Sequence, residues 1–325
     1  MNSVSISVVV GTHNRASLLP QALDSLADQT LDPARYEILV VDNHSTDATP
    51  SIVEQFRRRH PSLQITALYE PTVGLAYARN TGWRHARGGY VAFMDDDAKA
   101  DQQWLARALT CFENVSPVPL VAGGPILPYY SVSKPSWFKD SYELRSWGST
   151  PRFLKQGESF SGSNMIFRKQ VLNDFGGFDI RLGMQGNRIS VGEETSLFQK
   201  IVESARGLDS LALYYHPEMV VYHAIGRYKL CASYHVRRSF AVGRAWYVLH
   251  GPMGFRDQVR CLRMTLTALR QLSIAAVKAF REFPDYRNWV VECVGLVAIE
   301  FGRFVEGIRG CARALGKSQA GPKTT

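Results

Sequence analysis

The sequence is poor in cysteine, and the few cysteines that it has are scattered. None of the five belongs to a C-x-x-C pair; they are Cys111, Cys231, Cys261, Cys293 and Cys311. This pattern excludes a disulfide framework and argues against a zinc site built on paired cysteines. An odd number of separated thiols is typical of reduced cysteines, so we expect a cytoplasmic protein.

Long apolar runs are missing as well. A helix that spans a membrane needs about 20 consecutive apolar residues. The best candidate, residues 289–301, is shorter and contains Glu292 and Glu300. No basic segment precedes the apolar residues 6–10, which argues against a secretory signal. We therefore expect neither a transmembrane helix nor a signal peptide.

Several common catalytic motifs are absent too. The sequence contains no G-x-S-x-G elbow, no P-loop and no H-E-x-x-H. After the first apolar segment, residues 11–15 read GTHNR, where a dinucleotide-binding enzyme would have G-x-G-x-x-G. This difference disfavours a nicotinamide enzyme.

The composition permits a large core, but the charge is uneven. Hydrophobic residues make up 45% and charged residues 21% of the 325 residues, which is ordinary for a globular protein. Residues 226–325 contain 17 lysines and arginines against 6 aspartates and glutamates, whereas residues 1–225 contain 21 against 23. The basic excess of the last third indicates an anionic partner, either a membrane surface or a nucleic acid.

Apolar strand patterns and helical patterns alternate in the first half of the chain. We expect strands at residues 6–10, 36–41, 63–69 and 90–94, with helices near 19–26, 50–59, 74–85 and 104–112. This alternation predicts an α/β fold with an open, mostly parallel sheet covered by helices on both faces. Residues 127–157 read as a long irregular excursion. From about residue 228 the pattern is helical and amphipathic, so we expect a domain at 1–225 and a basic helical extension at 226–325.

Three of the expected strands end in polar clusters, at residues 12–15, 42–47 and 95–97. Ligands of such sheets bind outside the carboxyl ends of the strands. The triplet at 95–97 is the most informative, because a strand period of two places Asp95 and Asp97 on one face and Asp96 on the other. Two carboxylates on one face suit Mg²⁺ or Mn²⁺. An acidic turn that caps the next helix is the alternative.

Seven segments together resemble the inverting family 2 glycosyltransferases, which have the GT-A fold. They are residues 10–15 (VGTHNR), 40–47 (VVDNHSTD), 74–80 (GLAYARN), 95–97 (DDD), 162–168 (GSNMIFR), 176–179 (GGFD) and 192–194 (GEE). Their order and spacing match the family over residues 5–223, about two thirds of the chain. The resemblance implies a nucleotide-diphospho-sugar transferase fold followed by a C-terminal helical extension.

The resemblance also implies which residues bind the donor. Thr12, Asn14 and Arg15 would line the nucleotide pocket. Asp42 would accept a hydrogen bond from the base, and Arg79 would approach the ribose and diphosphate. Solvated charge on a helix surface is the alternative for Arg79.

The acidic triplet would face the sugar and the metal. By the same resemblance, Asp95 binds the ribose or sugar side of the donor, with Asp96 also in the donor site, and Asp97 holds Mn²⁺ or Mg²⁺. Asp95 and His223 are further candidate metal ligands, although a lone histidine after an apolar run is often structural.

Glu193 and Glu194 are the candidate catalytic pair. An inverting displacement needs a carboxylate that takes the proton of the acceptor hydroxyl. The family usually shows Glu-Asp here, and this sequence has Glu-Glu. We predict that Glu194 is the base and that Glu193 holds the acceptor. The extra methylene lengthens the reach by about 1.5 Å, so the reverse assignment stays open. A helix start is the structural alternative.

The acceptor would approach a glycine-containing segment. Gly162, Ser163 and Asn164 are the candidate acceptor-binding residues, because a glycine permits close approach to the backbone. Residues 183–192 would form a lid over the bound donor.

The sequence therefore predicts a metal-dependent inverting glycosyltransferase of hexosyl or N-acetylhexosaminyl type. The donor would be a UDP-, GDP- or dTDP-linked sugar, and the acceptor a glycan or a lipid-linked hydroxyl, in polysaccharide, cell-wall or glycolipid biosynthesis. A nucleotidyltransferase-like enzyme and a non-catalytic nucleotide- or membrane-binding module are the alternatives.

Two interpretations of the basic extension stay open. It lies on the anionic inner face of the plasma membrane, or its helices pack on the catalytic domain or on a second subunit of a homodimer. No nucleic-acid partner is expected for a transferase of this kind.

Overall fold

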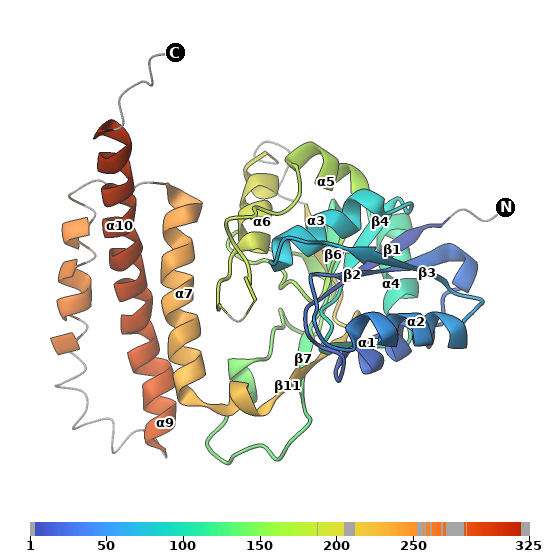
Figure 1. The fold of residues 1–325 in the computed structure, drawn as a ribbon, viewed down its shortest axis with the longest axis horizontal. Helices are drawn as coiled ribbons and strands as arrows, with labels where there is room; N and C mark the ends of the chain where they lie inside the picture. The colour runs from blue at the N-terminus through green and yellow to red at the C-terminus, as the bar shows by residue number, and fades with distance from the viewer. Residues whose placement is uncertain are drawn as a thin grey trace. The chain divides into compact units, whose positions relative to one another are not determined.

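The computed structural model describes residues 4–186, 188–204, 212–251 and 285–319, together with 256, 258–260, 262–267, 269–270 and 283; side chains are described as far as residue 310. The chain forms two compact units. Unit 1 comprises Met1–Ser131, Asp140–Gly186 and Glu193–Ile225, and unit 2 comprises Val132–Lys139, Asn187–Gly192 and Gly226–Thr325. Figure 1 shows the elements of each unit.

Unit 1 is built on an eight-stranded sheet with the order β3-β2-β1-β4-β9-β6-β10-β8. Its strands are β1 (Ile6–Thr12), β2 (Tyr36–Asp42), β3 (Gln64–Tyr69), β4 (Tyr90–Phe93), β6 (Val121–Gly123), β8 (Arg152–Phe153), β9 (Met165–Arg168) and β10 (Leu213–Tyr215). β1 pairs in parallel with β2 and β4, and β2 pairs in parallel with β3. β9 runs antiparallel to both of its neighbours. The predicted open, mostly parallel sheet is confirmed.

Helices cover both faces of this sheet, because side chains of a strand alternate between them. Ile6, Val8 and Val10 pack against α1 (Leu19–Ala27), α2 (Thr49–Arg59) and α4 (Trp104–Asn114). Val9 lies on the opposite face with α3 (Leu75–His85), α5 (Lys169–Phe175) and α6 (Glu193–Ser204). The first four helices begin and end close to the predicted residues.

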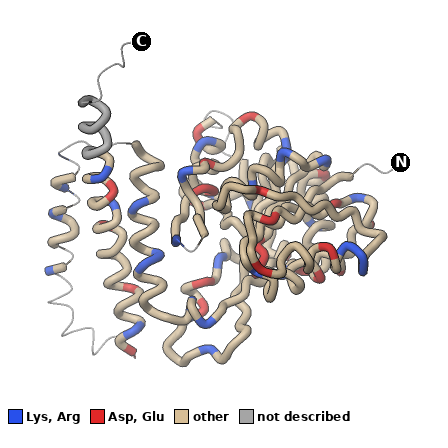
Figure 2. Tube along the Cα trace, in the orientation of Figure 1, with Lys and Arg blue, Asp and Glu red and all other residues tan. Residues whose placement is uncertain are grey.

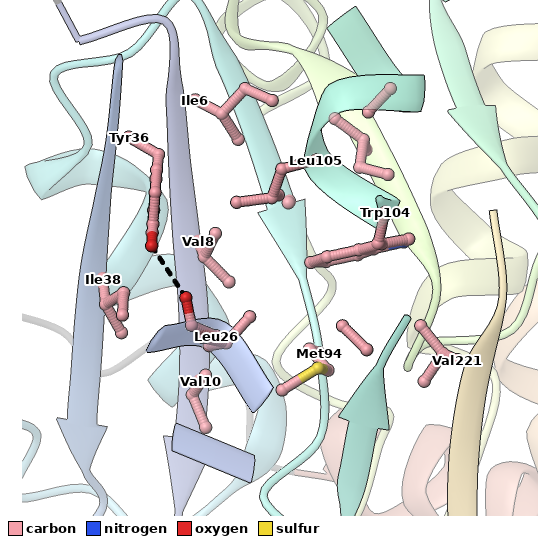
Figure 3. Close-up of a cluster of buried hydrophobic side chains, with 14 of the residues drawn as sticks. Ile6, Val8, Val10, Leu26, Tyr36, Ile38, Met94, Trp104, Leu105 and Val221 are labelled. Atoms are coloured by element: carbon pink, nitrogen blue, oxygen red, sulfur yellow. Dashed lines mark hydrogen bonds between the residues drawn. The ribbon is translucent and has the colours of Figure 1, made fainter. Parts of the chain in front are cut away.

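The core around β1 is drawn in Figure 3. Trp104 is fully buried there, in the same cluster as Leu105 and Val8. The hydroxyl of Tyr36 donates a hydrogen bond of 2.8 Å to the carbonyl of Leu26, which ties β2 to the end of α1. Burial raises the pKa of Tyr36 to about 12, so this bond persists at any physiological pH.

A second, three-stranded sheet takes one of its strands, β7, from the region predicted to be irregular. Its order is β5-β11-β7, formed by β5 (Ala98–Ala100), β11 (Val221–Ile225) and β7 (Ile126–Tyr130). The remaining short helices of unit 1 are η1 (Pro33–Arg35) and η2 (Asp140–Tyr142). β5 and β7 have three and five residues, so their sequences carry too few alternations to predict them.

Unit 2 is helical, as predicted for the C-terminal extension. It contains η3 (Arg227–Leu230), α7 (Ala232–His250), α9 (Tyr286–Trp289), η4 (Val290–Val294) and α10 (Gly295–Gln319). α7 and α10 lie side by side, and their contact requires glycine: a Cβ on Gly243 would lie 1.9 Å from the carbonyl oxygen of Ile299. Among the helices that the structure describes, none combines the length and hydropathy needed to cross a bilayer.

Candidate active site

The carboxyl ends of β1, β2 and β4 bring the predicted polar clusters to one edge of the large sheet. Thr12 and Asp42 are the last residues of β1 and β2 and are directly paired in register. Asp95 follows two residues after the end of β4, which pairs with the other side of β1. The parallel register therefore gathers residues that are more than 80 positions apart in the sequence at one place.

The small sheet brings His223 to the acidic triplet. On β11, His223 is paired with Ala98 of β5, the residue that follows Asp97, and the amide of Ala224 donates a 2.8 Å hydrogen bond to the carbonyl of Asp97. His223 Nε2 lies 3.0 Å from Asp97 Oδ1 and 3.8 Å from Asp95 Oδ2.

These three residues fit a divalent ion. One ligand atom from each of Asp95, Asp97 and His223 lies within 4.8 Å of the others. Two carboxylates and one imidazole are a donor set that suits Mn²⁺ especially and also Mg²⁺, ions that can keep positions for phosphate oxygens and water. The structure thus brings together the three predicted metal ligands.

The middle residue of the acidic triplet, Asp96, is buried. Burial raises the pKa of Asp96 to about 7, the Asp97 carboxylate adds to this shift, and the charge of Arg15 opposes it. The side chain of Asp96 is 8% exposed, so its part in donor binding remains a prediction.

Arg79 of α3 connects the acidic triplet with Glu193 of the candidate catalytic pair. Its guanidinium donates to Glu193 Oε1 at 2.8 Å and to Asp95 Oδ1 at 3.1 Å. Only 4% of the residue is exposed, and it packs over the ring of Phe178 at 5.5 Å. Burial alone would lower the pKa of Arg79, but the carboxylates of Asp95 and Glu193 raise it, so the side chain stays charged. Arg79 is therefore a buried link between two parts of the site.

Glu193 and Glu194 form the first turn of α6, and they have different surroundings. Glu193 is 4% exposed, and burial together with the adjacent Glu194 raises its pKa to about 8 against the opposing charge of Arg79. Glu194 is half-buried. One carboxylate oxygen of each, Oε2, is buried and has no hydrogen-bond partner within the described part of the chain. Such unpaired acceptors cost free energy unless a ligand supplies a donor.

Hydrogen bonds connect the loops that follow β1 and β2, which contain the residues predicted to bind the nucleotide. Asn14 has a left-handed backbone (φ 54°), and its side-chain oxygen accepts a 2.7 Å hydrogen bond from the amide of Thr46. Asp42 Oδ1 accepts from the amide of Ser45 at 3.0 Å. Asp47 accepts from the amides of Ala16 and Thr49, which fixes the start of α2. The loops after β1 and β2 therefore hold Thr12, Asn14, Arg15 and Asp42 as one group.

The segment at 162–164 forms hydrogen bonds that hold the acidic triplet and the surrounding core in place. Asn164 is fully buried; its amide donates to the carbonyls of Pro125 and Met219, and its oxygen accepts from the indole of Trp104 at 2.9 Å. Ser163 Oγ accepts from the amide of Asp95 at 3.3 Å. The side chain of Asn164 is thus fully used inside the core, and acceptor binding at this segment remains a prediction for Gly162 and Ser163.

Sequence reasoning missed two supports of the site. Asn43 is buried, and its side chain bridges the carbonyls of Glu70 and Thr72 and the amide of Gly74, so it fixes the approach to α3. Trp104 holds Asn164. The only feature of the sequence that pointed to Asn43 was its position as a polar residue directly after a buried strand. Of the predicted lid, residue 187 lies outside the described residues.

The comparison with solved structures defines the class of fold. A mannosyltransferase from Pyrobaculum calidifontis, solved with GDP-Man and Mn²⁺, matches with a TM-score of 0.62 at 22% identity, over 93% of this chain and 86% of its own. S. aureus TarS 1–349, solved with UDP, matches with a TM-score of 0.53 at 17% identity, over 98% of this chain and 93% of its own. At these identities the likeness concerns the fold, and the protein has the GT-A fold of nucleotide-diphospho-sugar transferases.

The sequence match then gives the family. The model of glycosyl transferase family 2 matches residues 7–176, just over half of the chain, and the protein belongs to this family. Glycosyltransferase AglE of Haloferax volcanii is 30% identical to this chain over 173 residues. The match covers 53% of this chain and only 55% of the length of AglE. The glucosyl-dolichyl phosphate glucuronosyltransferase of the same organism is 24% identical over 74% of this chain and 75% of its own.

Proposed function

We propose that the protein is a metal-dependent inverting glycosyltransferase that moves a sugar from a nucleotide diphosphate to an acceptor hydroxyl. The observation that carries the proposal is the edge of the large sheet where Asp95, Asp97 and His223 converge and where Arg79 links Asp95 to Glu193. A metal-type donor set and a carboxylate pair in one connected site are what an in-line displacement at a phosphate-linked carbon requires.

The donor side is formed by the loops after β1, β2 and β4. Asp42 and the group of Thr12, Asn14 and Arg15 bind the nucleotide, and Asp95 and Asp97 with His223 hold Mn²⁺ or Mg²⁺. When bound, the divalent ion supplies charge neutralisation for the diphosphate as its bond to the sugar breaks. The solved relatives bound to GDP-Man, and to UDP, support a nucleotide-sugar donor.

The acceptor side is formed by the start of α6. Glu194 accepts the proton of the acceptor hydroxyl, whose oxygen bonds to the anomeric carbon from the face opposite the diphosphate. The bond between that carbon and the diphosphate oxygen breaks, and the nucleotide diphosphate leaves with the electron pair. Burial and the adjacent Glu194 raise the pKa of Glu193, and Glu193 already accepts a hydrogen bond from Arg79, so we take Glu194 as the better base of the two.

The acceptor is a glycan or a lipid-linked sugar, and the transferred sugar is a hexosyl or N-acetylhexosaminyl group. The relative that acts on a glucosyl-dolichyl phosphate supports a lipid-linked acceptor. The basic excess of residues 226–325 supports a cytoplasmic protein that binds the inner face of the membrane peripherally, with a homodimer as the alternative use of the helices.

Thermal unfolding with a panel of UDP-, GDP- and dTDP-linked sugars tests the proposal. A ligand that binds the folded state raises the melting temperature, and at a given ligand concentration tighter binding gives a larger rise. We expect one nucleotide sugar to raise it strongly with Mn²⁺ and weakly with EDTA. If no nucleotide sugar shifts the melting temperature with either metal present, the protein does not use such a donor.

A further inference from the structure

Unit 2 contains a cavity that is separate from the residues of the proposed reaction. Its volume is about 820 Å³. Its wall is formed by Leu296, Ile299, Glu300 and Arg303 of α10 and, from the preceding helical stretch, by Arg256, Val259, Arg260, Arg263, Met264 and Thr267. A volume of this size is in the range of small-molecule sites and is far larger than a single inorganic anion needs.

One part of the cavity wall is strongly basic. Arg256, Arg260 and Arg263 lie at helical spacing and are exposed, and Arg303 contributes from α10. Glu300 is the one carboxylate among the described residues of the wall, and it accepts a 2.7 Å hydrogen bond from Arg303. Among the described residues, no carboxylate pairs with any of the other three arginines. Like charges at this spacing repel one another, and an anion between them would remove the repulsion.

Another part of the wall is apolar and continues onto the surface. Val259, Met264, Leu296 and Ile299 line the cavity, and 65% of Leu296 and 42% of Met264 are exposed. Leu266, a near neighbour in the same helical stretch, is 57% exposed. Leaving such side chains in water costs about 25 cal/mol per Å² of apolar surface, so the surface favours an apolar occupant.

A wall with both a basic part and an apolar part suits a ligand that is itself amphiphilic, with an anionic group and a hydrocarbon chain. Figure 2 shows how basic residues recur along the helices of this unit. A single-stranded nucleic acid would use aromatic side chains for stacking, and none of the described residues that line the cavity is aromatic. A free phosphate would satisfy the arginines and leave the apolar wall in water.

We propose that this cavity binds a lipid phosphate, with the phosphate headgroup among Arg256, Arg260 and Arg263 and the first part of the hydrocarbon chain on Leu296 and Ile299. The inference rests on unit 2 alone and does not depend on the proposed sugar transfer. It gives the protein a specific lipid site in addition to any general attraction between a basic surface and a membrane.

Sedimentation of the full chain with phosphatidylcholine vesicles, with and without phosphatidic acid, tests the site. The variant R256Q/R260Q/R263Q is compared with R57Q/R58Q/R59Q, which removes the same charge from exposed positions of α2. Each arginine near an anionic surface is worth a factor of several in binding, so the first variant should bind the phosphatidic acid vesicles roughly 100-fold more weakly. The control should bind like the wild type. An equal loss in both variants would show unspecific charge attraction and overturn the proposal.

A soluble probe separates a lipid from a free phosphate. Dodecyl phosphate below its micellar concentration should raise the melting temperature of the wild type, and inorganic phosphate at the same concentration should not. Leu296→Gln changes an exposed side chain and leaves the arginines in place, so it should fold normally and lose the dodecyl phosphate shift. Equal shifts with both probes, or an unchanged shift in Leu296→Gln, would contradict a lipid site.

Discussion

Arg79 and Glu193 lie 114 residues apart in the sequence, yet their side chains meet at 2.8 Å and are 4% and 5% exposed. Because Arg79 also donates to Asp95, one buried cation fixes the distance between the acidic end of β4 and the start of α6. The donor and acceptor halves of the proposed reaction are therefore held by the same guanidinium.

Removing this cation should destabilise unit 1. In Arg79→Ala, Glu193 and Asp95 lose their partner inside a buried site, which typically costs roughly 3–5 kcal/mol. We expect a lower free energy of unfolding in urea by this amount. Arg84→Ala removes an exposed arginine from the same helix and should change it by less than about 0.5 kcal/mol. Equal stability of the two variants would mean that the buried pairing contributes nothing.

A methyl group at Gly162 should disturb the same guanidinium. A Cβ there would lie 2.3 Å from Arg79 Nη2, so the arginine must shift away from Asp95 or Glu193. We expect Gly162→Ala to cost about 1–3 kcal/mol of stability and to reduce turnover. Gly89→Ala is the matched control, because a Cβ at Gly89 meets nothing within 4 Å. Full activity of Gly162→Ala would argue that the position of Arg79 is unimportant.

The titration of Glu193 should appear in the pH dependence of stability. Its pKa is about 8 in the folded protein and 4.5 ordinarily, so between these values the folded state binds more protons than the unfolded state. Stability contributed by this group is complete below pH 4.5 and falls as the pH rises toward 8. Wild type should therefore lose stability relative to Glu193→Gln across this window, measured by urea unfolding at several pH values. A constant difference between the two proteins would contradict the raised pKa.

Substitution of the proposed base should lower turnover without preventing donor binding, whereas substitution of a proposed metal ligand should weaken metal binding. Glu194→Gln should keep the donor-induced rise in melting temperature and lose turnover by about 10²–10⁴-fold, the usual contribution of a general base. If Glu194→Gln remains active and Glu193→Gln does not, the two roles are reversed.

Asp97→Ala and His223→Ala should lose Mn²⁺ affinity. Each removes one of three ligand atoms that lie within 4.8 Å of one another, so the affinity for Mn²⁺ should fall roughly tenfold or more. Calorimetric titration with Mn²⁺ measures it. His216→Ala serves as the control, since His216 is a histidine outside this group. Unchanged Mn²⁺ binding in both variants would place the metal elsewhere.

The strands and helices of the first half were predictable because their signals are local. Val8, Val9 and Val10 form a buried strand by composition alone, and the triplet at 95–97 follows such a strand directly. The partners of the triplet were not predictable from local patterns. His223 reaches Asp97 through the pairing of β11 with β5, and β5 has only three residues, which is too short to recognise. Arg79 meets Glu193 only because the fold brings α3 and α6 together. The local sequence therefore indicates which residue types are candidates for the site, whereas their neighbours depend on tertiary packing.

The stereochemistry of the product tests the central claim most directly. With the nucleotide sugar that shifts the melting temperature, Mn²⁺ and a glycan acceptor, NMR of the product should show an anomeric configuration opposite to that of the donor. Wild type should make this product together with free nucleotide diphosphate, and both Asp97→Ala and Glu194→Gln should fail to make it. A product that keeps the donor configuration, or that forms equally well in the presence of EDTA, would contradict a metal-dependent inverting transfer at this site.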